Sequence, residues 1–156
     1  MRRLNMLVVS DPNRLAELAK DASPEAVALA MMVLEGDLAN RAWTDQVGAS
    51  LTQRDTARLL GRTEQAVSKD NRLLRVHRRD GRPVYPVVQF DGRDQRTGVA
   101  DVIAAMDGAV GELALASWLT ATNAALGGRR PIDALADGEV AAVLAVADRF
   151  ASRMRR

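Results

Sequence analysis

Residues 52–72 read TQRDTARLLGRTEQAVSKDNR and contain two short helical patterns separated by Gly61. Thr52 and Thr63 each stand where a hydroxyl can cap the first turn of a helix. Gly61 supplies the left-handed backbone that lets a chain turn sharply. Small Ala57 and apolar Val67 would let the two helices cross closely. The spacing therefore predicts a helix-turn-helix whose first helix covers residues 53–60.

The exposed side of the second helix carries the candidate DNA-binding residues. In a helix-turn-helix, the N-terminal half of the second helix enters the major groove. Gln can read adenine edges, and Lys or Arg can read guanine or hold phosphates. The residues expected to face DNA are Thr63, Gln65, Ser68, Lys69 and Arg72. Thr56, Arg62 and Asp70 stand where many such units have apolar residues, so a helical pair that only packs is the alternative interpretation.

Two alternating runs, residues 74–78 and 82–87, follow the second helix and are separated by Arg79-Asp80-Gly81. Asp-Gly between such runs is a strong signal for a β-hairpin. Pro83 and Pro86 cannot donate to a ladder of hydrogen bonds, so we expect the second arm to be an edge strand. The helix-turn-helix would then carry a β-hairpin wing.

The charge distribution points to the same region. Residues 50–99 hold eleven basic and six acidic side chains, whereas the whole chain has a net charge of +2. This local surplus would attract a polyanion such as DNA. The wing would place Arg78 and Arg79 near the DNA backbone or minor groove, with His77 on the surface. A solvated arginine-rich surface is the alternative explanation for the charge alone.

Residues 1–50 predict helices that pack or dimerise. Asp11-Pro12 and Ser23-Pro24-Glu25 are helix start signals. Gly36 is expected to end the second helix, and Asp37 to cap a third. Apolar residues at helical spacing in this region are typical of a core or a dimer contact, and helix-turn-helix proteins usually pair to match a two-fold operator. We therefore expect a homodimer.

The last third of the sequence returns to helical patterns after a polar loop over residues 89–98. Helices are expected at Val99–Met106, Glu112–Thr120 and Pro131–Leu135, followed by a final helix capped by Asp137. The predicted fold is mainly α, with one short hairpin. Its expected parts are N-terminal helices over residues 1–50, the helix-turn-helix with its hairpin over 51–90, and a small helical domain over 99–156.

The composition argues against several classes of function. The chain has no cysteine and a single histidine, which removes thiol catalysis and cysteine-ligated metals. It has no glycine-rich phosphate loop, nucleophile elbow or metal-ligand spacing, so we expect neither an enzyme nor a cofactor. The longest clean apolar run, Ala26–Leu34, has nine residues, and a membrane span needs about 20. The sequence predicts a soluble cytoplasmic protein.

Residues 116–135, ASWLTATNAALGGRRPIDAL, are the most distinctive stretch of the chain. A tryptophan-bearing helix is followed by an Asn-containing loop, Leu-Gly-Gly, Pro-x-Asp-x-Leu and a long closing helix. This order resembles the toxin-binding domain of Xre/MbcA/ParS-type antitoxins over about residues 100–151. The pairing of an N-terminal helix-turn-helix with such a C-terminal domain is also similar to that family.

The resemblance implies a type II antitoxin that blocks a RES-family toxin, an enzyme that degrades NAD, and that represses its own operon at operator DNA. The residues that would build or present the toxin-binding surface are Trp118, Asn123, Leu126, Gly127, Arg129, Pro131 and Leu135. From the residues alone, a tight connection between helices with solvated arginines is the favoured interpretation of residues 126–131. The alternative function is a winged helix-turn-helix regulator with a small-molecule effector pocket among the C-terminal helices.

Overall fold

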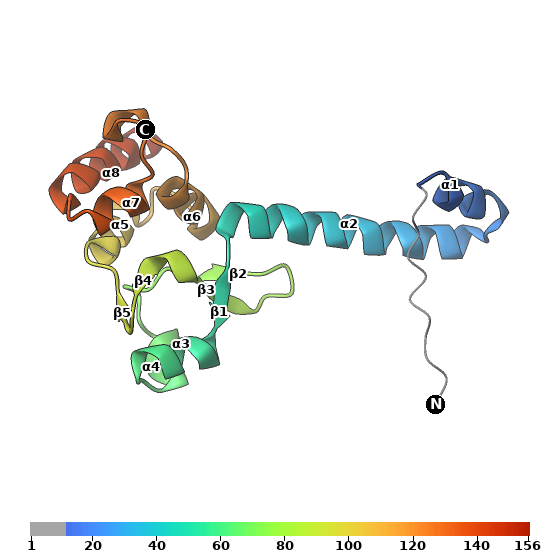
Figure 1. The fold of residues 1–156 in the computed structure, drawn as a ribbon, viewed down its shortest axis with the longest axis horizontal. Coiled ribbons are helices and arrows are strands. Elements are labelled where there is room, and N and C mark those ends of the chain that lie inside the picture. The colour runs from blue at the N-terminus through green and yellow to red at the C-terminus, as the bar shows by residue number, and fades with distance from the viewer. Residues whose placement is uncertain (1–11) are drawn as a thin grey trace. The chain divides into compact units, whose positions relative to one another are not determined.

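The computed structural model describes residues 12–156, which are mainly helical with a small antiparallel sheet (Figure 1). The predicted mainly-α class is confirmed at this level. The chain divides into two compact units between Ala42 and Trp43. Asp11, expected to start the first helix, lies outside the described residues. None of the described helices is long and apolar enough to cross a membrane.

The first unit consists of α1 (Pro12–Asp21) and most of α2 (Pro24–Val47). The expected break at Gly36 is wrong, because α2 continues through it without interruption. One glycine inside a helix costs only about 1 kcal/mol relative to alanine, and Leu34, Glu35 and Leu38 around it are good helix formers. Asp37, expected to cap a new helix, instead pairs with Arg41 one turn later at 2.9 Å.

Helices form on both sides of Gly61 as predicted, but the second helix ends at Ser68, so Lys69 and Arg72, expected on its exposed side, follow it instead. α3 covers Gln53–Leu60 and α4 covers Glu64–Ser68. The Oγ1 atoms of Thr52 and Thr63 accept hydrogen bonds from the amides three residues ahead, both at 3.1 Å. Gly61 ends α3 in the left-handed region, with φ of 62°. The caps and the turn therefore fix both helices locally.

A three-stranded antiparallel sheet lies beside these helices. It consists of β1 (Ser50–Thr52), β2 (Val76–His77) and β3 (Pro83–Pro86), in the order β1-β3-β2. The predicted hairpin is present as β2 and β3, but the expectation that β3 is an edge strand is wrong. β3 is central, and each of its prolines lies at an end where only one neighbour flanks it: Pro83 pairs only with β2, and Pro86 only with β1.

The segment over residues 87–95 contains regular structure, although a polar loop is expected from residue 89 onward. It begins with the 3-10 turn η1 (Val87–Gln89) and continues as a small hairpin of β4 (Phe90–Asp91) and β5 (Asp94–Gln95). Gln89 is completely buried. Its side-chain amide accepts from the amide of Leu74 and donates to the carbonyl of Leu74, both at 2.8 Å. This pair of bonds fixes the segment to the end of the α3–α4 region.

The C-terminal region contains α5 (Val99–Met106), α6 (Glu112–Thr120), the 3-10 turn η2 (Ala124–Leu126), α7 (Pro131–Ala136) and α8 (Val140–Met154). These agree with the predicted helices, except that Asp137 ends α7 rather than capping α8. Gly98 precedes α5 with φ of 88°, and a Cβ there would lie 2.7 Å from Cδ2 of Leu135. Only glycine fits this contact.

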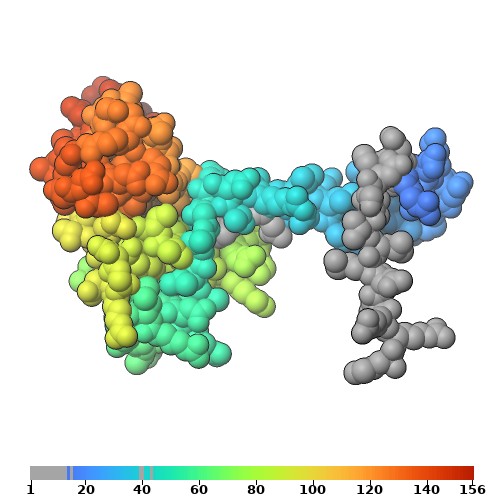
Figure 2. Space-filling model, in the orientation of Figure 1, coloured from blue at the N-terminus to red at the C-terminus, as the bar shows by residue number. Residues whose placement is uncertain are grey.

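Two hydrophobic clusters hold the second unit together, and its segments pack side by side in the space-filling view (Figure 2). The smaller cluster joins α3, α4 and β3 through Ala57, Val67 and Tyr85. The larger cluster is formed by α5–α8 and also includes Leu74 and Val76. Leu73 belongs to the smaller cluster, so the segment after α4 contributes consecutive side chains to both cores.

Candidate nucleic-acid interface

The polar residues of α4 and its caps differ in their exposure and in the hydrogen bonds that their side chains already make. Gln65 and Lys69 are exposed. Thr63 is also exposed, but its hydroxyl oxygen is engaged in capping α4. Ser68 is half-buried, and its hydroxyl donates to the carbonyl of Gln65 at 3.0 Å. Of the predicted residues on α4 and at its two caps, Gln65 and the C-cap residue Lys69 therefore present the most accessible polar groups.

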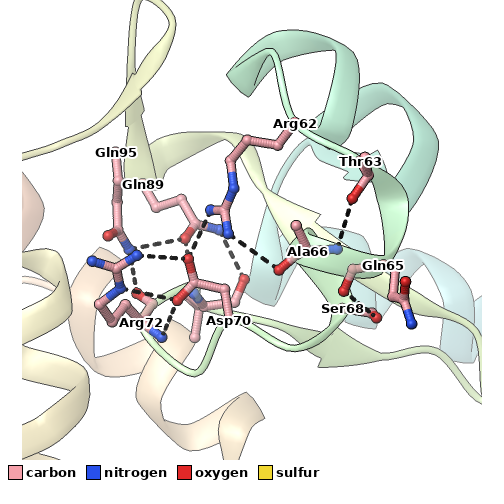
Figure 3. A network of polar contacts seen from close by, with 10 residues as sticks. Arg62, Thr63, Gln65, Ala66, Ser68, Asp70, Arg72, Gln89 and Gln95 are labelled. Atoms are coloured by element: carbon pink, nitrogen blue, oxygen red, sulfur yellow. Dashed lines mark hydrogen bonds and ion pairs between the residues drawn. The ribbon is translucent and has the colours of Figure 1, made fainter.

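Asp70 organises the chain directly after α4 (Figure 3). Its side chain is only 7% exposed, and its carboxylate accepts from Nη1 of Arg62 at 2.7 Å. Nε and Nη2 of Arg72 donate to the two carboxylate oxygens, each at 3.1 Å. The amide of Arg72 also donates to Oδ1 at 2.9 Å. Asp70 and Arg62 thus form a partly buried ion pair at positions where an apolar contact is expected.

These contacts control the charge of Asp70. Hydrogen bonds from the Arg72 side chain, followed by those from Arg62, hold the pKa of Asp70 well below its ordinary value of 3.8, although partial burial acts in the opposite direction. The carboxylate is therefore ionised at neutral pH, and its charge is neutralised by the two guanidinium groups. Arg62 also donates to the carbonyl of Ala66 at 3.1 Å. Arg72 keeps a side chain that is 73% exposed.

The β2–β3 hairpin carries further exposed cations. Arg78 and Arg79 lie at its turn and are exposed, and the amide of Arg78 donates to the carbonyl of Arg82 at 2.9 Å. His77 is also on the surface as expected, with a side chain 47% exposed, and its Nδ1 lies 2.9 Å from Oε1 of Glu112. The backbone amide of His77 donates to the same oxygen at 2.7 Å. Sequence reasoning missed this link between the hairpin and α6, because Glu112 is 35 residues away.

The predicted toxin-binding residues are divided between the core and the surface. Leu126, Pro131 and Leu135 are buried, so in this structure they hold the loop rather than face solvent. Trp118 is half-buried, and its ring centroid lies 6.2 Å from that of Phe150. Gly127 is exposed, with φ of 67°.

Two further residues shape the same loop. Asn123 caps η2 through its Oδ1, which accepts from the amide of Ala125 at 3.0 Å. Arg129 donates to Asp137 at 3.0 Å and to Glu139 at 2.5 Å. The hydrogen bond from Arg129 lowers the pKa of Glu139. Arg129 therefore closes the loop onto the start of α8, a role that the sequence did not reveal.

An open cavity of about 570 Å³ lies between the segment after α4 and helices α5 and α6. Its apolar lining includes Leu73, Ile103 and Met106, and charged Arg75 and Glu112 also line it. Within residues 12–156, no group of three or more His, Asp or Glu side chains is arranged to hold a metal ion.

Comparison with protein-family models, curated proteins and solved structures returned no match for this chain. The function is therefore inferred from the site residues and from the resemblance of residues 116–135.

Proposed function

We propose that this chain is an antitoxin that binds operator DNA and blocks a RES-family NAD-degrading toxin. DNA binding is assigned to α3 and α4 as a helix-turn-helix, with the β2–β3 hairpin as its wing. The observation that carries this part is the capped α4 helix, which exposes Gln65 and, at its C-cap, Lys69, within the stretch of residues 50–99 that has a surplus of five positive charges. Such a protein acts in the cytoplasm as a binding protein, without catalysis.

The proposed contacts follow from the exposure of each side chain. Gln65 and Lys69 would reach base edges or phosphates in the major groove. Arg72 is held at the edge of this surface by Asp70 and would contact a phosphate. Arg78 and Arg79 would contact the backbone or minor groove from the wing.

The test of DNA binding is fluorescence anisotropy with duplexes from the region upstream of the gene, at several salt concentrations. Removing a phosphate contact with Lys69→Ala should weaken binding to all sequences and reduce the salt-dependence slope by about 1. Gln65→Ala should relax preference at one base pair. Lys20→Ala removes an exposed cation from α1 and is the matched control. No binding at low salt, or equal loss with the control, would reject the proposal.

Toxin binding is assigned to the η2 loop and its surroundings. The buried Leu126, Pro131 and Leu135 would fix the loop, while the exposed Ala124, Ala125 and Gly127 would meet the toxin. Because Arg129 is bound to Asp137 and Glu139, its role would be to hold the loop in shape. The resemblance of residues 116–135 to antitoxins supports this assignment.

The toxin proposal is tested by co-expressing the tagged chain with the product of the neighbouring gene and measuring cellular NAD. The neighbour alone should deplete NAD, and this chain should co-purify with it and restore NAD. Ala125→Asp places a charge on the exposed loop and should abolish the rescue of NAD. Ala141→Asp, at an exposed position of α8, should leave the rescue intact. If NAD is unaffected and nothing co-purifies, the toxin assignment fails.

The cavity of about 570 Å³ favours a second candidate, a DNA-binding regulator with a small-molecule effector. Its apolar lining and flanking charges would suit a small amphipathic molecule. Native mass spectrometry of the purified full chain tests this idea. A species heavier than the 16.9 kDa chain would support an effector if the extra mass is lost in the variant Ile103→Trp. A spectrum that shows only the mass of the chain itself would count against it.

A further inference from the structure

The helix α2 contains an apolar segment that nothing in the described chain covers. Residues 26–34 are nine consecutive apolar residues, and all of them except the half-buried Val27 are exposed. Nine residues make two and a half turns, so apolar side chains lie on every side of the helix. A helix that is apolar all round is normally buried. This segment therefore requires a partner.

Two simple ways of covering the segment fail. α2 does not qualify as a membrane span. The neighbouring helix α1 does not bury the segment either, because Leu18 of α1 is itself 56% exposed. Leu29 and Met32 remain 64% and 70% exposed. Both helices of the first unit thus present apolar side chains to the outside.

The exposed area matches what a stable dimer needs. The large apolar residues of this surface are 47–70% exposed and comprise Leu18, Leu29, Met31, Met32, Val33, Leu34 and Leu38. At roughly 100 Å² for a side chain of this size, they and the intervening alanines expose about 500 Å² of apolar area. A standard interface buries about 800 Å² per partner, of which somewhat more than half is non-polar. One copy therefore exposes about as much apolar area as one side of a standard interface buries.

We infer that this surface, residues 26–38 of α2 together with Leu18, is where two copies of the chain associate. The segment is self-complementary: if two copies are centred on Ala30, apolar residues face apolar residues whichever way the helices run. The charged side chains within residues 26–38 are only Glu35 and Asp37, and Asp37 already pairs with Arg41 in the same helix, so the surface is mainly apolar. The two-fold symmetry of helix-turn-helix operators agrees with this pairing, and that last point alone rests on the proposed function.

Sedimentation velocity on the full-length chain at about 20 µM, without DNA or toxin, tests the inference. The wild type should sediment as a species with twice the 16.9 kDa mass of one chain. The double variant Leu29→Glu/Met32→Glu should be monomeric, with its dimer dissociation constant raised at least 100-fold. Met154→Glu is the matched control, since Met154 is 52% exposed and lies on α8, and it should remain dimeric.

A milder variant keeps the result interpretable if the double glutamate loses helix content by circular dichroism. Met32→Gln removes the most exposed apolar side chain of α2 without adding charge, and it should weaken the dimer by at least tenfold. A monomeric wild type, or a variant that dimerises like the wild type, would overturn the inference. Because no DNA or toxin is present, either outcome is independent of whether the proposed function is correct.

Discussion

Replacing Asp70 with asparagine should destabilise the second unit by about 2–3 kcal/mol at pH 7. The substitution keeps the size of the side chain and removes its charge, so no cavity forms. It weakens the 2.7 Å ion pair with the one-third-exposed Arg62, and it also weakens the bond from the amide of Arg72. Hydrogen bonds to charged groups contribute about 1.5–3 kcal/mol each. The exposed Arg72 side chain adds little, because solvent screens it.

The pH dependence distinguishes this mechanism from a general loss of packing. The pKa of Asp70 in the folded chain is lowered below its ordinary value of 3.8. The stability that its charge provides is therefore present above about pH 4 and is lost as the pH falls towards the folded-state pKa. The difference between wild type and variant should be full at pH 7 and should shrink progressively below pH 4.

Urea unfolding at pH 7 and pH 3, followed by circular dichroism, measures both effects. Asp91→Asn is the control, because Asp91 is exposed in the small hairpin, and it should change stability by less than about 0.5 kcal/mol. A variant as stable as the wild type at pH 7 would refute the buried ion pair. An equal loss at both pH values would refute the role of the charge.

Three further outcomes are expected. Gly98→Ala should lower stability by about 2–4 kcal/mol in urea unfolding, because its Cβ would lie 2.7 Å from Leu135 at a φ of 88°. Gln65→Ala should reduce discrimination at one operator base pair by about 1–3 kcal/mol in competition binding, with little change for non-specific DNA. Arg129→Ala should release the η2 loop and speed its amide hydrogen exchange. In the wild type, the lowered pKa of Glu139 gives a small stabilisation that is present at neutral pH and is lost below about pH 4.5, and the variant should lack this stabilisation.

The parts of the fold that the sequence predicted are those whose hydrogen bonds close within a few residues. The α3 and α4 helices have capping hydroxyls three residues from the amides they bond, and a glycine at the turn. The β2–β3 hairpin is likewise set by its Asp-Gly turn. Such signals can be read from one stretch of chain, because donor and acceptor are neighbours in the sequence.

The features that sequence reasoning missed depend on distant partners. β1 is a strand only because β3 lies beside it, and Gln89 is buried because Leu74 offers it both a donor and an acceptor. The polar pattern of residues 89–98 gave the opposite expectation, a loop. Gly36 failed as a stop signal for another reason: the cost of one glycine is smaller than the helical preference of its flanks.

The same distinction explains the candidate site. Asp70 counts as one of six acidic residues in the basic region and would repel DNA if it were exposed. The fold turns it inward between Arg62 and Arg72, so its charge serves to orient arginine rather than to oppose phosphate. The net charge of the region is unchanged by this, since the carboxylate still offsets one guanidinium group, but the tertiary contacts decide where the remaining positive charge is exposed, at the 73% exposed Arg72 side chain.

The α3–α4 region and the C-terminal helices are joined by more than chain continuity. Consecutive residues Leu73 and Leu74 pack into different clusters, and Glu112 of α6 accepts from both the backbone and the ring of His77. Any displacement of α6 by a bound partner must break these hydrogen bonds or carry the β2–β3 hairpin with it. If the proposed toxin displaced α6, toxin binding and the proposed DNA binding would be linked energetically through the hairpin that bears Arg78 and Arg79, and each partner would then change the affinity for the other by the same factor.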